Sequence, residues 1–473
     1  MQKFKIASFI FIVFIMQFSK AHAQNDFHKS LFQLQQDFMD LRFGMFICIG
    51  SPTFQDEDWA DPNMSPAIFN PSKLDCNQWA EVAISAGMKY GCLTTKHHSG
   101  FCIWDTKTTD YNVMNSSYKH DIVKEYADAF RSHGLKVCLY YSVLDIHHNL
   151  RPGWIEPKKH TQFVKDQLTE LLTKYGEISE LVIDGWDASW SRISYEDVDF
   201  EEIYQLIKKL QPNCLVLEHN AAKYPAQEMF YTDVKHYEQN AGQKISKATN
   251  DIPAQAGIPI NATWFWKTNS PTEQLKNVDS IVINNLIPLN EAHCNFILSV
   301  EPNREGLIDN NAVQALKLIG EKWKNTGNAP KLPRETRPII SHNLAKFLKS
   351  NSSWSDFYLS DFGNDDDFKG RAWISNISVK QPWYEVDFAK QQTFNMIVIS
   401  ELYDGKKYNE ARIIDYDFQY FDGNKWLDIP IEKSNKIIKI CRFPVVQGEK
   451  VRVLITKFLP RPTIAEFGVY NER

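Results

Sequence analysis

The stretch HDIVKEYADAFRSHGLKVCLYYS, residues 120–142, contains one complete helix-and-strand unit. Its first part carries apolar residues at spacings of three and four, which is typical of an amphipathic helix, and Gly134 follows as a helix-ending residue. Its second part, Lys136 to Ser142, is apolar almost throughout, as expected for a strand buried on both faces. This unit predicts a parallel sheet covered by helices.

Similar units recur along residues 40–325. The other expected strands are Phe43 to Ile49, Tyr90 to Thr95, Glu180 to Asp184, Cys214 to Glu218 and Cys294 to Val300. Late helices are expected from Pro271 onward and over Asn311 to Lys324. Such repeats form either a closed barrel or an open doubly wound sheet, and no G-x-G-x-x-G follows the first strand to support a dinucleotide fold. The sequence therefore predicts an α/β fold, a (β/α)8-like barrel of the TIM type.

The character of the chain changes after this region. The segment NTGNAPKLPRETRP is rich in Pro, Gly and charged residues and is typical of a linker. Short alternating runs follow it, such as WYEVDFA, KVRVLI and IAEFGVY, which predict an antiparallel all-β sandwich. We expect a signal peptide at 1–23, a catalytic barrel at 24–325, a linker at 326–336 and the β-sandwich at 337–473.

The N-terminus predicts export. Lys3 and Lys5 precede an apolar run from Ile6 to Phe18, and Ala21-His22-Ala23 forms a small-x-small cleavage site. The apolar run is short for a bilayer span, and we expect no membrane span elsewhere. The protein is therefore expected in the periplasm or outside the cell, with the signal removed.

Composition narrows the class of partner. The net charge of -5 over 473 residues is mild and argues against nucleic-acid binding, which usually shows basic clusters. The eight cysteines include no C-x-x-C pair, and several lie inside apolar strand-like runs, so we expect mostly free buried thiols and no structural zinc.

Barrel enzymes place their active sites at the carboxyl ends of the strands, so polar residues directly after apolar strands are the candidates. Three expected strand ends carry such residues. The second leads to His97 and His98 after Lys96, the third ends in Tyr140-Tyr141-Ser142, and the fourth ends in Asp184 of ELVID. Neutral imidazoles suit sugar hydroxyls because they both donate and accept hydrogen bonds. The alternatives are one solvent-facing and one structural histidine, and a helix N-cap role for Asp184. No third ligand at a recognisable spacing supports a metal site.

These residues carry a resemblance. The blocks FGMFICIG, DEDWADP, KHHSGFCIW, LKVCLYYSVLDI, ELVIDGWD and SVEPNREGLI together resemble the α-L-fucosidases of glycoside hydrolase family 29, over most of residues 40–325. The β-rich end, with WYEVDF, DGNKW and IAEFGVY, resembles the discoidin-like (coagulation-factor type C) sandwich. Such domains either bind carbohydrate or only pack against the barrel.

The fucosidase resemblance implies roles for individual residues. Asp184 falls on the nucleophile of a retaining mechanism with a covalent fucosyl-enzyme intermediate. The positions implied to bind the sugar are Asp58, Trp59, His97, His98, Tyr141 and Trp264. An aromatic face suits the apolar side and the methyl group of a deoxy sugar. The implied partner is a fucosylated glycan, and no cofactor or metal is expected.

The chain departs from the family pattern at three places. Cys48 and Ile49 replace a sugar-binding His and a Trp, and Ile183 stands where an aromatic residue is usual. Gln255 occupies a position that holds the acid/base glutamate in one branch of the family, and a glutamine has no titratable proton to give. Glu238 is therefore our candidate for the general acid/base.

The second-choice candidates for the general acid/base are Glu218, Glu57 and Asp58. The sequence thus supports an exported exo-acting glycosidase that removes α-linked L-fucose or a close relative. The alternative is a sugar-binding protein on a barrel that has lost its acid.

Overall fold

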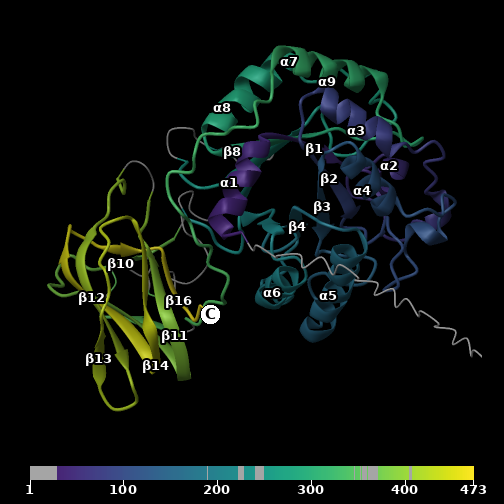
Figure 1. Cartoon of the computed structure of the whole chain (residues 1–473). Coiled ribbons are helices and arrows are strands. Elements are labelled where there is room, and N and C mark those ends of the chain that lie inside the picture. Colours follow the sequence, from purple (N-terminus) through teal and green to yellow (C-terminus); the bar gives the residue numbers. More distant parts are fainter. Residues whose placement is uncertain are drawn as a thin grey trace, which may run out of the picture.

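The computed structural model describes residues 29–188, 190–221, 228–239, 245, 250–345, 347–351, 353, 360, 371–403 and 407–472. The expected signal peptide, residues 1–23, lies outside the described residues. The described chain forms a parallel eight-stranded barrel followed by an antiparallel β domain, which Figure 1 shows beside it. The predicted α/β barrel with a following antiparallel β unit is therefore confirmed.

Eight parallel strands line the barrel in the order β5-β4-β3-β2-β1-β8-β7-β6. They are β1 (Phe43–Ile47), β2 (Tyr90–Lys96), β3 (Lys136–Ser142), β4 (Glu180–Asp184), β5 (Leu215–Glu218), β6 (Lys235–Glu238), β7 (Ala254–Pro259) and β8 (Cys294–Ser299). The six strands expected from the sequence are present within two residues at each end. β6 and β7 had no sequence prediction because KHYE and AQAGIP lack a continuous apolar run.

β5 and β6 stand at the two ends of this hydrogen-bonded path, and residues just before β6 bridge them. The backbone N–H of Asp233 donates to the Val216 carbonyl at 2.7 Å, and the Asp233 carboxylate accepts from the Val216 N–H at 2.9 Å. The Thr232 hydroxyl accepts from the Glu218 N–H at 3.1 Å. Side chains thus satisfy backbone groups of β5 that a full strand pairing would otherwise satisfy.

Helices cover the outside of the barrel (Figure 1). The longer ones are α1 (Leu31–Leu41), α3 (Cys76–Ser85), α4 (Ile122–Ser132), α5 (Pro157–Lys174), α6 (Phe200–Leu210) and α9 (Asn310–Lys322). Short helical pieces are α2 (Ser51–Gln55), η1 (Pro66–Ile68), η2 (Val113–Asn115), α7 (Val278–Ile281), η5 (Val282–Leu286) and α8 (Ile287–Glu291). The carboxylates of Asp75, Asp121 and Asp199 cap α3, α4 and α6 by accepting backbone N–H groups of the first turn.

The helix expected from Pro271 is wrong in its start. Turns follow Pro271, and helix begins only at Val278, where the Asn277 side chain accepts the Ser280 N–H as an N-cap. The Asn277 cap therefore sets the start of this helix.

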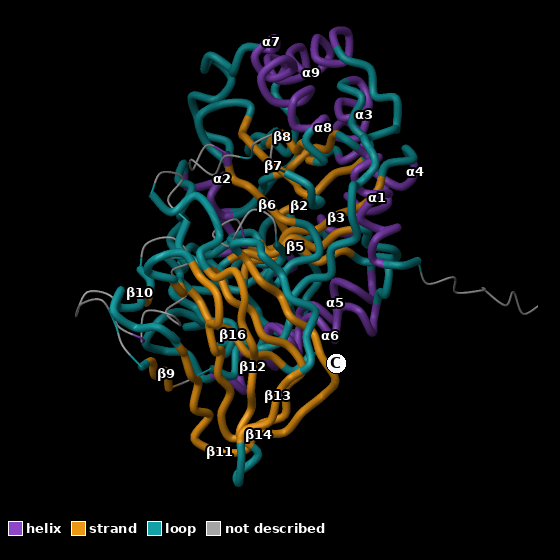
Figure 2. Tube along the Cα trace, turned by 90° about the vertical axis from the view of Figure 1, so that its left-hand side faces the viewer, coloured by secondary structure: helices purple, strands orange, loops and turns teal. Residues whose placement is uncertain are grey.

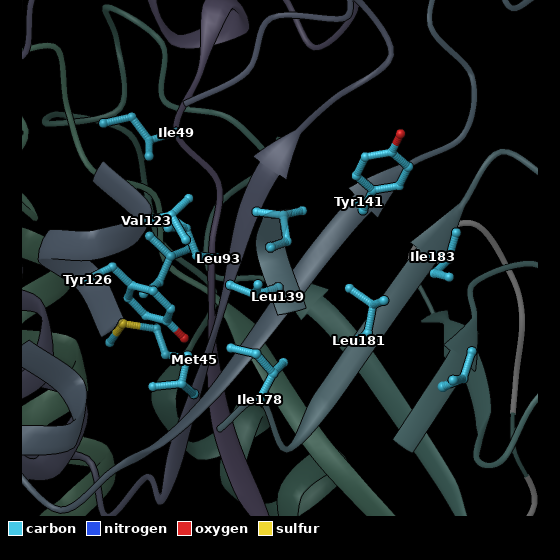
Figure 3. Close-up of a cluster of buried hydrophobic side chains, with 14 of the residues drawn as sticks. Met45, Ile49, Leu93, Val123, Tyr126, Leu139, Tyr141, Ile178, Leu181 and Ile183 are labelled. Atoms are coloured by element: carbon cyan, nitrogen blue, oxygen red, sulfur yellow. The ribbon is translucent and has the colours of Figure 1, made fainter. Parts of the chain in front are cut away.

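Residues alternate between two hydrophobic layers along β1, β2 and β3. Phe46, Cys92 and Tyr140 belong to the inner cluster, whereas Met45, Leu93 and Tyr141 belong to the outer cluster packed under the helices. Figure 3 shows this outer layer, with Tyr141 drawn among aliphatic side chains and Tyr126 of α4. A strand presents successive side chains to opposite faces, so this alternation decides which residues reach the active site.

One irregularity breaks the alternation at the end of β2. Thr94 pairs with Tyr140 and Lys96 pairs with Tyr141, so Thr95 is an extra residue in the ladder. Lys96 consequently points to the outer layer, where its Nζ lies 3.0 Å from each of Tyr141, Asp145 and Gln167. The bulge leaves the following residues, His97 and His98, at the barrel mouth.

The second domain is antiparallel, as predicted. Its strands are β9 (Phe347–Ser350), β10 (Trp373–Ile374), β11 (Trp383–Ser400), β12 (Ile413–Phe421), β13 (Trp426–Ile429), β14 (Ile438–Phe458), β15 (Thr463–Ile464) and β16 (Glu466–Tyr470). The main sheet has the order β13-β12-β14-β11-β16, β9 pairs with β11, and β10 pairs with β15. Figure 2 shows these strands as a layer separate from the barrel strands. The discoidin-like assignment stays a prediction.

The expected linker is fixed to the barrel. The backbone N–H of Ala329 donates to Asp40 of α1, and that of Leu332 donates to Gln36, both at 2.9 Å. The second domain also packs on the barrel, since Met396 and Tyr470 are buried in the outer hydrophobic cluster. The two folded units therefore share a buried apolar contact.

All eight cysteines lie within the described residues, and each is buried and free, as the sequence predicted. No helix in the described parts of the chain is long and apolar enough to cross a membrane.

Candidate active site

A cavity of about 340 Å³ opens at the carboxyl ends of the barrel strands. Side chains from β1, β2, β3, β4, β6 and the loops that follow the strands converge on it. Its lining consists of Phe46, Cys48, Asp58, Trp59, Thr94, His97, His98, Tyr140, Asp184, Trp190, His219, Glu238, Trp264 and Phe265. A concave, mostly aromatic site with a few convergent polar groups has the form of a small-molecule pocket.

Asp184 ends β4 with its carboxylate almost buried in this cavity, 6% exposed. One oxygen, Oδ1, accepts the Gly185 N–H at 2.7 Å and the Asn220 side-chain amide at 3.1 Å. The other, Oδ2, accepts the Tyr140 hydroxyl at 2.5 Å and lies 3.8 Å from His98 Nε2. These three hydrogen bonds fix the orientation of the carboxylate. Gly185 has a φ of 97°, a conformation that suits glycine, and an added Cβ there would clash with the Leu144 backbone.

His97 and His98 are neutral imidazoles. Burial lowers the pKa of His97 well below its ordinary value, with a further lowering from His98, and burial together with the His219 charge lowers the pKa of His98 to about 3. His97 Nδ1 is buried and has no hydrogen-bond partner. A buried polar atom that lacks a partner in the free site is available to a ligand hydroxyl.

Aromatic rings form one wall of the cavity. Trp59 is 51% exposed and its ring centroid lies 4.6 Å from that of His98 and 5.3 Å from that of Trp190. Next to Trp59, the Asp58 Oδ1 atom is buried without a hydrogen-bond partner. The wall therefore offers an apolar face beside an unsatisfied acceptor, a combination that suits a sugar ring.

Glu238 ends β6 on another side of the cavity. Its Oε1 accepts the Trp264 indole N–H at 3.0 Å, and its Oε2 lies 3.6 Å from His219 Nε2. Burial raises the pKa of Glu238, but the close contact with His219 and the charge of His219 outweigh burial and hold the pKa below its ordinary value. Glu238 and Asp184 are thus two carboxylates of one cavity, with a histidine beside them.

Comparison with known proteins identifies the family. A family model described as alpha-L-fucosidase matches residues 14–328, more than half of the chain. The chain belongs to the α-L-fucosidase family. It is accordingly a glycoside hydrolase, an α-L-fucosidase by class.

Individual α-L-fucosidases are distant relatives over most of the chain. Alpha-L-fucosidase 1 of Arabidopsis thaliana is 27% identical over 457 residues, which cover 91% of this chain and 85% of that protein. Putative alpha-L-fucosidase 1 of Oryza sativa subsp. japonica is 25% identical over 465 residues, 93% of this chain and 84% of that protein. The structure of alpha-L-fucosidase isoenzyme 1 from Paenibacillus thiaminolyticus matches with a TM-score of 0.52 at 21% identity, over 90% of this chain and 99% of that one. The match to the Paenibacillus thiaminolyticus structure shows a similar fold.

The structure brings together most of the residues singled out for fucosidase chemistry. The cavity is lined by Asp58, Trp59, His97, His98, Asp184, Glu238 and Trp264. Tyr141 is the exception. Its hydroxyl donates to Gln167 of α5 at 2.7 Å in the outer layer, and its neighbour Tyr140 faces the cavity instead. Strand alternation puts only one of two adjacent residues on the inner face, so the expected position of Tyr141 is corrected to Tyr140.

Of the three residues Cys48, Ile49 and Ile183 that depart from the fucosidase pattern, only Cys48 lines the cavity. Cys48 lines the cavity, where its sulfur lies 3.5 Å from the Thr94 hydroxyl and 3.6 Å from the Ser299 hydroxyl. Ile49 and Ile183 belong to the outer hydrophobic cluster under the helices. The replacement at Cys48 therefore alters the cavity lining, whereas the other two lie in the packing under the helices.

Gln255 lies in the barrel interior and not in the cavity lining. Its Nε2 donates to Tyr90 at 3.0 Å and to Glu180 at 2.9 Å, and its Oε1 accepts His236 Nδ1–H at 2.8 Å. These are the contacts of a buried structural amide. The Gln255 side chain is therefore not placed to act as an acid or a base in the cavity.

The other carboxylates named from the sequence lie outside the cavity lining, except Asp58. Glu218 is fully buried beside the site, and burial raises its pKa to about 8. The sequence reasoning missed Phe46, Thr94, Trp190, His219 and Phe265 as lining residues. His219 directly follows β5, so the strand-end rule that selected Asp184 selects it as well. No group of three or more metal-ligating side chains was found among the described residues.

Proposed function

We propose that this chain is an exported, retaining exo-α-L-fucosidase that hydrolyses terminal α-L-fucosyl linkages of glycans. The observation that carries the proposal is the position of Asp184, held by three hydrogen bonds in a cavity that also contains Glu238 and two neutral histidines. Retaining glycosidases need two carboxyl groups in one site, one as nucleophile and one as acid/base.

In the proposed mechanism, Asp184 Oδ2 attacks the anomeric carbon while the leaving oxygen receives a proton from the Glu238 side of the cavity. A water molecule then attacks the fucosyl ester, with Glu238 as the base, and the sugar leaves with its anomeric configuration retained. The Tyr140 hydroxyl, 2.5 Å from Asp184 Oδ2, positions the attacking oxygen. The same hydrogen bond stabilises the carboxylate when it departs in the second step.

Sugar recognition follows from the chemistry of the wall. The free atoms of His97 and Asp58 would pair with ring hydroxyls, and Trp59 would pack on the apolar face of the ring. Phe46, Trp264 and Phe265 supply the apolar surface that a methyl group prefers. A cavity of about 340 Å³ suits one sugar ring, which supports removal of single terminal residues.

The second candidate function is a non-catalytic sugar-binding protein on a degenerate fucosidase barrel. One observation favours it, namely that the pKa of Glu238 lies below its ordinary value. A general acid works best when its pKa lies near the working pH, so Glu238 alone would be a weak donor.

The domain boundaries and the location are also proposals. We propose a signal peptide at 1–23, a catalytic barrel at 24–325, a connecting segment at 326–336 and a β-sandwich at 337–473, with the mature protein in the periplasm or outside the cell. The positive and apolar N-terminus supports export. N-terminal sequencing of the secreted protein tests this, and a mature chain that begins near Gln24 is expected.

A pair of substrates tests the proposed function. The protein is incubated with a nitrophenyl α-L-fucoside and with a natural fucosylated oligosaccharide, and the released sugar is followed by NMR. Release of α-L-fucose as the first anomer supports a retaining fucosidase. Release of the β anomer contradicts the mechanism, and cleavage of neither substrate with fucose still bound supports the sugar-binding protein.

A further inference from the structure

His219, the residue after β5, lies in the cavity beside both carboxylates. Its Nε2 is 3.6 Å from Glu238 Oε2, and its side chain is 9% exposed. Its ring stacks on His236 at a centroid distance of 4.3 Å and meets the Tyr140 ring edge-on at 6.1 Å. Its Nδ1 atom is buried without a hydrogen-bond partner. The ring is therefore fixed by packing, with one nitrogen directed at Glu238.

His219 differs in charge from the histidines around it. Burial lowers the pKa of His219, but the charge of Asp184, the close contact with Glu238 and the charges of Glu238 and Glu218 outweigh burial and raise the pKa to about 9. Burial lowers the pKa of His236 to about 3, and burial also lowers the pKa values of His97 and His98. The titratable groups that interact with His219 are Asp184 on β4, Glu218 on β5, His236 and Glu238 on β6, Tyr140 on β3, and His97 and His98 after β2. At neutral pH the mobile proton of this cluster rests on His219.

We propose that His219 stores the transferable proton of the reaction and that Glu238 passes it to the leaving glycosidic oxygen, an assignment that rests on the proposed fucosidase function. The pair acts as one acid/base unit. If Glu238 were the only acid, its own carboxyl group would have to hold the proton. The positive charge of His219 beside it disfavours that protonated form.

The first step forms the fucosyl ester on Asp184 and moves one proton from His219 to the leaving oxygen. A bond forms between Asp184 Oδ2 and the anomeric carbon, and the bond from that carbon to the glycosidic oxygen breaks. The oxygen takes a proton from Glu238, which takes the proton of His219 Nε2. His219 is then neutral, Glu238 is again a carboxylate, Asp184 is an ester and the aglycone leaves as an alcohol.

The second step restores the starting state. Water forms a bond to the anomeric carbon, and the bond to Asp184 Oδ2 breaks. The proton of the water passes to Glu238 and returns to His219. The Asp184 charge couples the two steps, because its loss on ester formation removes one cause of the raised pKa of His219. The proton is thus held firmly before the attack and less firmly during it.

Leaving-group dependence tests this role. We expect His219→Gln and Glu238→Gln each to lose about 10²- to 10⁴-fold in kcat/KM on methyl α-L-fucoside and less than about 10-fold on a nitrophenyl α-L-fucoside, which needs little protonation. The double variant is expected to lose no more than about 10-fold beyond either single variant, because the two groups act as a unit. His120→Gln, an exposed histidine, is the matched control and retains wild-type rates.

A purely positioning role for His219 predicts something different. The wild-type dependence on leaving group would then persist in His219→Gln, with a uniform loss on both fucosides, and that result overturns the proposal. The pH profile gives a second readout. The basic limb of kcat/KM near pH 9 in the wild type is expected to disappear in His219→Gln.

Histidine NMR tests the proposal without a His219 variant. The wild type is expected to show one buried imidazolium that titrates at about pH 9, and Asp184→Asn is expected to move that titration to lower pH. A neutral His219 at pH 7 overturns the proposal even if the enzyme is active. Inactivity of the wild type on both fucosides overturns the proposed function instead, so the two failures are distinguishable.

Discussion

His98 Nδ1 lies 2.7 Å from the Ser142 hydroxyl oxygen, and that hydroxyl donates its own hydrogen to the Leu144 carbonyl at 2.8 Å. Because the hydroxyl hydrogen is committed to the carbonyl, the Nδ1 atom must be the donor. His98 is neutral, so its Nε2, directed toward Asp184, carries the lone pair. A serine at the end of β3 thus sets the tautomer of a cavity histidine and leaves its Nε2 as an acceptor, as the proposed contact with a sugar hydroxyl requires.

Replacement of Ser142 by alanine tests this tautomer control. In Ser142→Ala, the buried Nδ1–H loses its acceptor at a cost of about 1–3 kcal/mol, and the ring is free to change tautomer. We expect fucose affinity, measured by calorimetry, to fall by about 5- to 100-fold. Ser117→Ala removes an exposed hydroxyl and is expected to leave the affinity unchanged. Wild-type affinity in Ser142→Ala contradicts the assigned role of His98.

Two adjacent tyrosines on β3 provide a matched pair. Tyr140→Phe removes the hydroxyl that donates to Asp184, and hydrogen bonds to a charged group contribute about 1.5–3 kcal/mol. We expect kcat to fall by about 10- to 100-fold on a nitrophenyl fucoside.

Tyr141→Phe removes a hydroxyl that contacts Lys96 and Gln167 in the outer layer. This variant is expected to lose thermal stability while kcat and KM stay within about twofold of the wild type, since the side chain does not line the cavity. Steady-state kinetics and thermal melts of both variants check the pair. A larger effect of Tyr141→Phe on KM would restore Tyr141 as the sugar ligand.

The cysteines predict a thiol pattern. Burial raises the pKa of the Cys48 thiol to about 12, and burial also raises the pKa of the other buried thiols of the barrel. Since the thiolate is the reactive form, the native protein is expected to show no fast reaction with iodoacetamide at neutral pH. After denaturation without a reductant, mass spectrometry should find eight alkylated cysteines, because all eight are free. A smaller number would reveal disulfides.

Glu180, at the start of β4, predicts a loss of stability in alkali. Burial raises its pKa from 4.5 to about 8, against a smaller lowering by the hydrogen bond from Gln255. The folded pKa exceeds the unfolded one, so the contribution of Glu180 to stability is full below about pH 4.5 and is lost as the pH rises through about 8.

The isosteric Glu180→Gln removes this titration. Relative to wild type it is expected to gain several kcal/mol in free energy of unfolding at about pH 9 compared with about pH 5, since each pKa unit corresponds to about 1.4 kcal/mol. Urea unfolding at both pH values measures the change. Glu81→Gln, on an exposed face of α3, is the control, and the same pH dependence in wild type and Glu180→Gln would contradict a buried neutral Glu180.

The sequence predicts the fold well where the strands are continuous apolar runs. β3 and β4 have the expected bounds, because burial on both faces selects apolar residues at every position. β6 and β7 escape the same reasoning, since their inner residues His236 and Gln255 form a polar hydrogen-bond network inside the barrel. Tertiary contacts, and not a local pattern, make these segments strands.

The site was predictable at strand ends and less so in side-chain direction. Asp184, His97 and His98 follow apolar strands and do line the cavity. The choice between Tyr140 and Tyr141 depends on the inward or outward phase of β3, which two adjacent tyrosines leave open. Trp190 reaches the cavity from a loop after β4 and contacts Trp59, a meeting of distant segments that no local pattern contains.

Trapping the covalent intermediate tests the central claim most directly. The protein is treated with a fluorinated α-L-fucosyl fluoride, which forms the glycosyl-enzyme quickly and releases it slowly, and the labelled peptide is identified by mass spectrometry. The account predicts one fucosyl unit on Asp184 and none in Asp184→Asn. A label on another carboxylate, or turnover without any covalent adduct, would contradict it.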